Sequence, residues 1–63
     1  MSKLYQKDLT ALTDLMNYEQ SACKKCEFYA SQLTDPATQE LVGALARCHR
    51  TRFQSLYDFL NKM

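Results

Sequence analysis

The apolar residues of this chain recur at the three- and four-residue spacing of an α-helix, in two long segments. Two heptad rows run along the first segment. They consist of Leu9, Met16, Cys23 and Ala30, and of Tyr5, Leu12, Glu19, Cys26 and Leu33. Leu15, Ala22 and Tyr29 widen this stripe, as expected for a helix that faces the core of a bundle. The pattern predicts one helix over about residues 4–33.

The second segment repeats the same periodicity. Its main row is Val42, His49, Leu56 and Met63, its second row is Leu45, Arg52 and Phe59, and Leu41, Cys48, Phe53, Tyr57 and Leu60 broaden the two. This pattern predicts a second helix over about residues 36–62. Each helix of roughly 25 residues would be roughly 37 Å long at a rise of 1.5 Å per residue.

A single strong break, at residues 34–36, separates the two helical patterns. Asp35 suits an N-cap, and Pro36 suits the first helical position, where a missing N–H costs nothing. The start of the first helix is less defined, because Ser2 could cap it or Asp8 could cap a shorter version. A connection this short forces the two helices to lie antiparallel.

The predicted fold is therefore all-α, a single helical-hairpin domain over residues 1–63. Two helices cannot cover apolar faces this wide, whereas four can, so the expected assembly is a homodimeric four-helix bundle. Gly43 would cost about 1 kcal/mol inside a helix. Its presence there predicts a close approach of two backbones.

Composition narrows the range of functions. A chain of 63 residues builds only a small core, and its three cysteines cannot all pair, which argues against a disulfide scaffold. Free thiols without a signal peptide indicate an intracellular protein. A net charge of +1 gives no electrostatic basis for binding nucleic acid, and the short apolar runs predict no membrane span.

Two polar residues interrupt the apolar stripes at one level. If the turn is centred near residues 34–35, residues whose numbers sum to about 69 face each other, which places Glu19 close to His49. A buried carboxylate and imidazole require partners. One hypothesis is a hydrogen-bonded layer of Glu19 and His49 closed by Arg52, which would fix the register of a bundle. The other is a metal site in which the Glu19 and His49 side chains of two copies bind a transition metal such as zinc or iron.

The cysteines allow two interpretations. Cys23 and Cys26 form a CxxC motif in mid-helix, far from the N-terminal dipole that activates redox pairs of this kind. Cys23 lies one turn from Glu19 and near the level of Cys48, so it could serve as a third metal ligand. Alternatively, the thiols fill gaps in the core as alanine would, which we favour because no second CxxC completes a tetrahedral set.

Other side chains give little indication of chemistry. Tyr18 and Phe28 fall off the main stripe and are expected to be exposed, either as contacts for a partner or simply as surface aromatics. The sequence contains no Ser-His-Asp arrangement, glycine-rich phosphate loop or paired catalytic carboxylates. The sequence thus predicts a protein that is not an enzyme.

The spacing of certain residues resembles the ferritin-like superfamily, nearest to short spore coat proteins of the coat F type. The residues that carry this resemblance are Leu12, Leu15, Glu19, Ala22, Tyr29, Asp35, Pro36, Ala37, Glu40, Leu41, Ala46, His49, Phe53, Leu56 and Tyr57. Ferritin-like di-metal sites use a glutamate on the first helix of each hairpin and a Glu-x-x-His on the second. The resemblance thus matches Glu19 to the first ligand and His49 to the histidine, while Ala46 stands where the bridging glutamate belongs.

This resemblance implies a bundle kept for assembly, with a structural polar layer in place of a di-iron centre. The expected function is a non-catalytic, coat-like or assembly protein that acts through homodimerisation and meets other coat or assembly proteins, in the cytoplasm or the spore. The alternative is a metal-binding dimer with a degenerate site of Glu19 and His49, with Cys23 as a further ligand.

Overall fold

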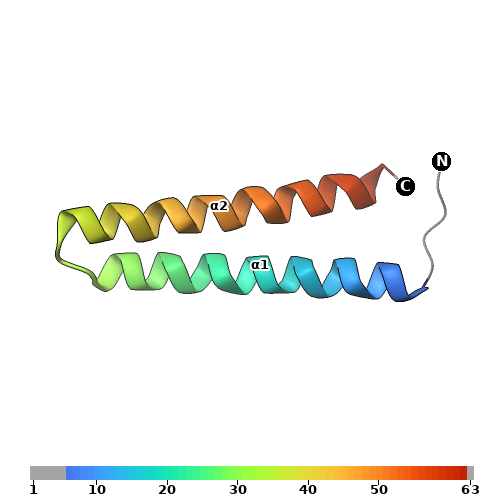
Figure 1. Cartoon of the computed structure of the whole chain (residues 1–63), viewed down its shortest axis with the longest axis horizontal. Coiled ribbons are helices and arrows are strands. Elements are labelled where there is room, and N and C mark those ends of the chain that lie inside the picture. The colour runs from blue at the N-terminus through green and yellow to red at the C-terminus, as the bar shows by residue number, and fades with distance from the viewer. Residues whose placement is uncertain (1–5, 63) are drawn as a thin grey trace.

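The computed structural model describes residues 6–62 and shows two antiparallel α-helices (Figure 1). Helix α1 spans Gln6–Gln32 and helix α2 spans Pro36–Asn61. The all-α helical hairpin is therefore confirmed. Helix α1 begins before Asp8, so the shorter helix capped by Asp8 is wrong. Ser2, Tyr5 and Met63 lie outside the described residues.

The turn is closed by the cap of α2. Asp35 has an extended backbone, and its Oδ2 accepts hydrogen bonds from the backbone N–H of Thr38 at 2.9 Å and from the Thr38 hydroxyl at 2.7 Å. These two bonds, the hydroxyl first and the backbone N–H second, lower the pKa of Asp35 below its ordinary value of 3.8, since both favour the ionised carboxylate. Pro36 follows as the first residue of α2, as the sequence predicted.

A side chain from α2 completes the C-terminus of α1. The amide Nε2 of Gln39 donates to the carbonyl of Ala30 at 3.0 Å and to that of Leu33 at 3.3 Å. The last carbonyls of a helix lack partners within the helix. Gln39 therefore does at this end what a left-handed glycine does in many helices, and no described residue has a positive φ.

The seam between the helices follows alternating three- and four-residue steps. Its buried and half-buried residues are Leu12, Met16, Glu19, Cys23, Cys26 and Ala30 on α1, and Val42, Ala46, His49, Phe53, Leu56 and Leu60 on α2. Among the described residues only Glu19, Cys23 and Ala46 are buried, at 8%, 7% and 4% exposure. The hairpin on its own thus has a very thin core.

On α2 the second row differs from the prediction. Leu45, Arg52 and Phe59 are exposed, and the residues one position later along the helix form the inner row, with Ala46 as its most buried member. A single partner helix covers only a narrow stripe of α2. The small side chain of Ala46 allows that partner, α1, to come close. The broad stripe of the sequence is therefore divided into a covered half and an exposed half.

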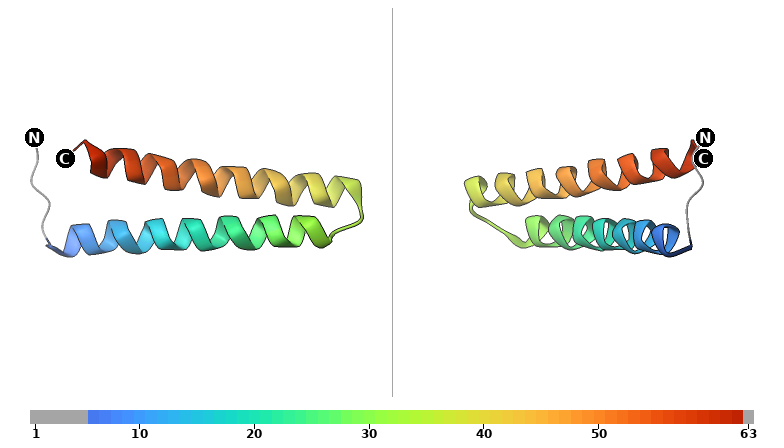
Figure 2. Two further views of the ribbon diagram at one scale, coloured as in Figure 1. Left: turned by 180° about the vertical axis from the view of Figure 1, so that it is seen from behind. Right: turned by 45° about the vertical axis from the view of Figure 1, so that its right-hand side comes forward.

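The size of the seam residues changes along the hairpin. Near the turn they are small, as at Ala30, Cys26 and Ala46, whereas toward the termini they are large, as at Met16 and Phe53. The helix axes accordingly diverge from the turn toward the chain ends (Figures 1 and 2). The resulting molecule is long and thin, 47 × 16 × 11 Å, with a radius of gyration of 14.7 Å against about 10.6 Å for a compact domain of this length.

Gly43 does not mark a close approach of backbones. A Cβ atom built there would meet only the Nη1 atom of Arg47, at an ordinary van der Waals distance of 3.7 Å. Within the hairpin that prediction is wrong: position 43 lies on the flank of α2 that Arg47 crosses to reach Glu40.

Neither described helix combines the length and apolar character needed to cross a lipid bilayer.

Candidate functional site

Glu19 and His49 meet at the middle of the hairpin. Glu19 comes from the fourth turn of α1 and His49 from the fourth turn of α2, so the two residues lie at one level of the antiparallel pair. Glu19 Oε1 and His49 Nδ1 are 2.6 Å apart, and their side chains are only 11% and 15% exposed. The direct contact between Glu19 and His49 that the network hypothesis required is confirmed.

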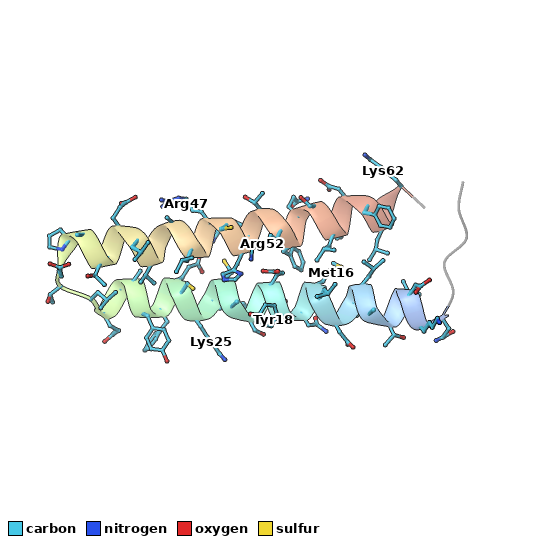
Figure 3. The ribbon with its side chains drawn as sticks, viewed as in Figure 1. Met16, Tyr18, Lys25, Arg47, Arg52 and Lys62 are labelled. Carbon is cyan, nitrogen blue, oxygen red and sulfur yellow. The ribbon has the colours of Figure 1, made fainter. Side chains whose placement is uncertain are left out.

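Arg52 is not part of this contact. Among the described residues it forms no ion pair and no side-chain hydrogen bond, whereas Arg47 pairs with Glu40 and Arg50 with Glu27. The network closed by Arg52 is therefore not formed within one hairpin. Arg52 is exposed and lies one turn from His49 on α2, at mid-length of the molecule (Figure 3).

A groove of about 350 Å³ runs along this side of the seam. Its surface is mostly apolar. The lining residues are Leu15, Glu19, Thr51, Arg52, Ser55 and Leu56, of which Glu19 and Arg52 are charged. Glu19 is part of this lining, so the groove reaches the Glu19 side of the Glu19–His49 contact. The Tyr18 ring is edge-on to the His49 ring at a centroid distance of 6.4 Å.

The other side of the seam is polar. A smaller groove of about 180 Å³ is lined there by Gln20, Cys23, Lys24, Glu27, Arg50 and Phe53. The Arg50 guanidinium pairs with Glu27 across the two helices and lies 3.9 Å from the Cys23 thiol. Charged side chains therefore already occupy this side with partners of their own.

The hairpin consequently has one apolar face, which we define by six exposed residues. They are Leu15, Tyr18, Tyr29, Leu41, Leu45 and Phe59, with exposures between 46% and 62%. At 100° per residue, those on α1 and those on α2 project to the same side of the antiparallel pair, the side of the larger groove. Phe28 is equally exposed, at 59%, but lies on the outer surface of α1 away from this face.

The structure brings together only part of the candidate metal site. Glu19 and His49 touch, while Cys23 is a free, buried thiol on the polar side of α1 beside Arg50. Within residues 6–62, no group of three or more His, Cys, Asp or Glu side chains is arranged to hold a metal ion. One hairpin therefore offers at most two ligands, already hydrogen-bonded to each other, and a metal site would need a second copy.

The position of Ala46 bears on the ferritin-like hypothesis. Ala46 is the most buried residue, at 4% exposure, and lies in the tight half of the seam. A glutamate at this point would have to enter the contact between the two helices.

Comparison with known protein families, with curated proteins and with solved structures finds no match.

Two interactions escaped the sequence patterns. The Gln39 bonds to α1 and the Arg50–Glu27 pair both join residues of different helices. Neither has a local motif. The only signal in the sequence was the position of each residue along the hairpin. The residue numbers of Glu19 and His49 sum to 68, whereas those of Glu27 and Arg50 sum to 77. This larger sum means that Glu27 and Arg50 are offset along the axis, and only long side chains can bridge that offset.

Proposed function

We propose that this chain is a non-catalytic assembly protein whose working unit is a homodimeric four-helix bundle. The observation that carries the proposal is the apolar face, which runs along both helices beside a seam that buries only three of the described residues. The two hairpins pack with these faces together, so that exposed leucine and aromatic side chains become the core.

The extent of exposed surface supports this reading. The chain exposes 5009 Å², about a fifth more than the roughly 4,200 Å² expected for a compact monomer of 7.3 kDa. A standard interface buries about 800 Å² on each partner. The surplus of the elongated hairpin is thus of the size that association removes.

A second copy is the occupant that fits the face best. A twin hairpin presents an apolar face of the same length, and a two-fold arrangement closes without leaving a free face. The face has few charges, since only Glu19 and Arg52 lie on the groove side among the residues that line it. It therefore lacks the cationic character of surfaces that bind nucleic acid or anionic lipid.

The outer surface of such a dimer remains available for further assembly. It includes Phe28, whose ring makes an edge contact with the Tyr29 ring of the apolar face at a centroid distance of 5.6 Å. The resemblance to coat F-type proteins supports a coat-like role in which dimers meet other coat or assembly proteins.

A metal-binding dimer is the second candidate, favoured by the Glu19–His49 contact at mid-length. A two-fold axis near this level would bring two copies of each side chain together. The direct hydrogen bond competes with metal ligation, because the same Oε1 and Nδ1 atoms would have to turn toward the ion.

Native mass spectrometry of the untagged protein tests both candidates. We expect a metal-free dimer. Leu45→Glu, on the apolar face, should shift the protein to monomer, whereas Phe28→Glu, an equally drastic change on the outer surface, should leave the dimer intact. Circular dichroism of each variant checks that the helices persist.

The outcomes separate the candidates. A wild-type monomer, or a dimer that survives Leu45→Glu and dissociates with Phe28→Glu, would overturn the proposed interface. A dimer that retains one or two metal ions, and that melts at a lower temperature after chelation, would establish the metal-binding alternative.

A further inference from the structure

Arg52 is a cation on the side of the hairpin that carries the apolar face. It lines the larger groove together with Leu15 and Leu56, yet among residues 6–62 it has no carboxylate partner. The proposed function covers this groove with a second hairpin. An arginine buried there without an acceptor would oppose association, because its charge would lose water and gain nothing in return.

One acceptor on this face is free. Glu19 uses Oε1 for His49, and its Oε2 makes no hydrogen bond within the described part of the chain. Every fully buried side-chain oxygen or nitrogen there has a partner, so Oε2 retains access to the groove. A carboxylate oxygen that opens onto an apolar groove is the complement that the Arg52 guanidinium requires.

We propose that Arg52 pairs with Glu19 of a second copy, and that this reciprocal pair sets the alignment of the two hairpins. The inference rests on the proposed dimer and adds its register. By two-fold symmetry the contact occurs twice, so each copy supplies one guanidinium and one carboxylate. The polar layer of Glu19, His49 and Arg52 is then complete only in the dimer.

The geometry of the hairpin restricts how this pairing can form. Glu19 and His49 lie at one level, and Arg52 lies three residues beyond His49, about 4.5 Å toward the chain ends. In one arrangement, α2 of one copy stacks on α1 of the other, and the Glu19–His49 contacts of both copies lie at the same height along the bundle. Arg52 then lies about one turn from Glu19 of the second copy. If instead each helix stacks on its own twin, Glu19 of the second copy lies on the diagonal helix. The pair thus selects the first arrangement.

Mixing two variants, each with one charged side chain replaced by a neutral glutamine, tests the pairing. Glu19→Gln leaves two unpaired arginines in its homodimer, and Arg52→Gln leaves two carboxylates without a cation from the other copy. A mixed dimer restores one complete pair. After equimolar mixing and exchange, native mass spectrometry should show heterodimer in about tenfold excess over the statistical ratio, as expected for close charges across an interface.

The control is wild type mixed with Arg47→Gln, which removes a cation whose partner Glu40 lies on the same outer surface. That mixture should give the statistical ratio. A statistical ratio for Glu19→Gln with Arg52→Gln as well would overturn the pairing while leaving the dimer in place. A monomeric wild type would overturn the proposed function itself, so the two failures are distinguishable.

Discussion

At the scale of single residues, Glu19 and His49 depend on each other, because each is largely buried and each engages the other through one 2.6 Å contact. We expect Glu19→Leu or His49→Leu alone to lower the free energy of unfolding by about 1.5–3 kcal/mol, since either change leaves a buried polar group without its partner. The double replacement should cost clearly less than the sum. Urea denaturation at fixed protein concentration measures this coupling.

The exposed pair of Glu40 and Arg47 is the matched control for this cycle. Their side chains are 79% and 65% exposed, and their coupling should fall below about 1 kcal/mol. Equal coupling for the two pairs, or strict additivity at Glu19 and His49, would contradict the assignment of a structural role to the polar layer.

Gly43 gives a second prediction at this scale. Since a Cβ atom fits there without a clash, Gly43→Ala should raise the free energy of unfolding by about 1 kcal/mol through better helix propensity. Ala44→Gly, one residue later and exposed, should lower it by a similar amount. Thermal melts of both variants measure the change, and a loss of stability in Gly43→Ala would show that a second backbone does approach position 43.

The sequence predicted which apolar residues lie inward more accurately for α1 than for α2. Within α1, every described member of the two heptad rows except Leu9 lies inward; Thr13, Gln20 and Glu27 flank these rows on one side, and Leu15, Ala22 and Tyr29 on the other. On α2 apolar residues extend around more than half of the helix. The choice between Leu45 and Ala46 for the inner row depended on how closely the helices approach, and no pattern on one helix contains that distance.

At the scale of elements, the start of α2 depends on the charge of Asp35. Because its pKa is lowered in the folded chain, mainly by the Thr38 hydroxyl, ionised Asp35 stabilises the fold above pH 3.8, and this contribution disappears as the pH falls through the lowered value. Wild type should therefore melt at a higher temperature than Asp35→Ala near neutral pH, and the difference should shrink below pH 3.8. Thr38→Val should weaken this pH dependence.

Thermal melts monitored by circular dichroism between neutral and strongly acidic pH provide the measurement. A difference between wild type and Asp35→Ala that stays constant over this range would mean that the carboxylate charge plays no part in the cap. The cap itself could be predicted because it is local: Asp35, Pro36 and Thr38 are close in sequence. The bonds from Gln39 to α1 could not, because they require the returning helix to be in place.

At the scale of the whole molecule, two features of the hairpin lack a partner within the described residues. Its apolar face has no cover, and Arg52 has no carboxylate within the described residues. The same partner resolves both, because a second copy brings an apolar face and a free Glu19 oxygen together. The sequence could predict that more than two helices were needed, from the width of the stripes, but the placement of Arg52 outside the intrachain contact emerged only from the packed seam.

The pairing of Arg52 with Glu19 of a second copy makes a prediction about the shape of the dimer. Stacking α2 on α1 of the other copy with levels preserved places both turns at the same end of the bundle, whereas stacking each helix on its twin places them at opposite ends. Spin labels at Thr34→Cys, with the three native cysteines replaced, report this directly. We expect a separation within about 25 Å, since neighbouring helices in a bundle lie 8–10 Å apart. A separation close to the 47 Å length of the hairpin would instead place the turns at opposite ends and exclude the pairing, even if the dimer itself forms.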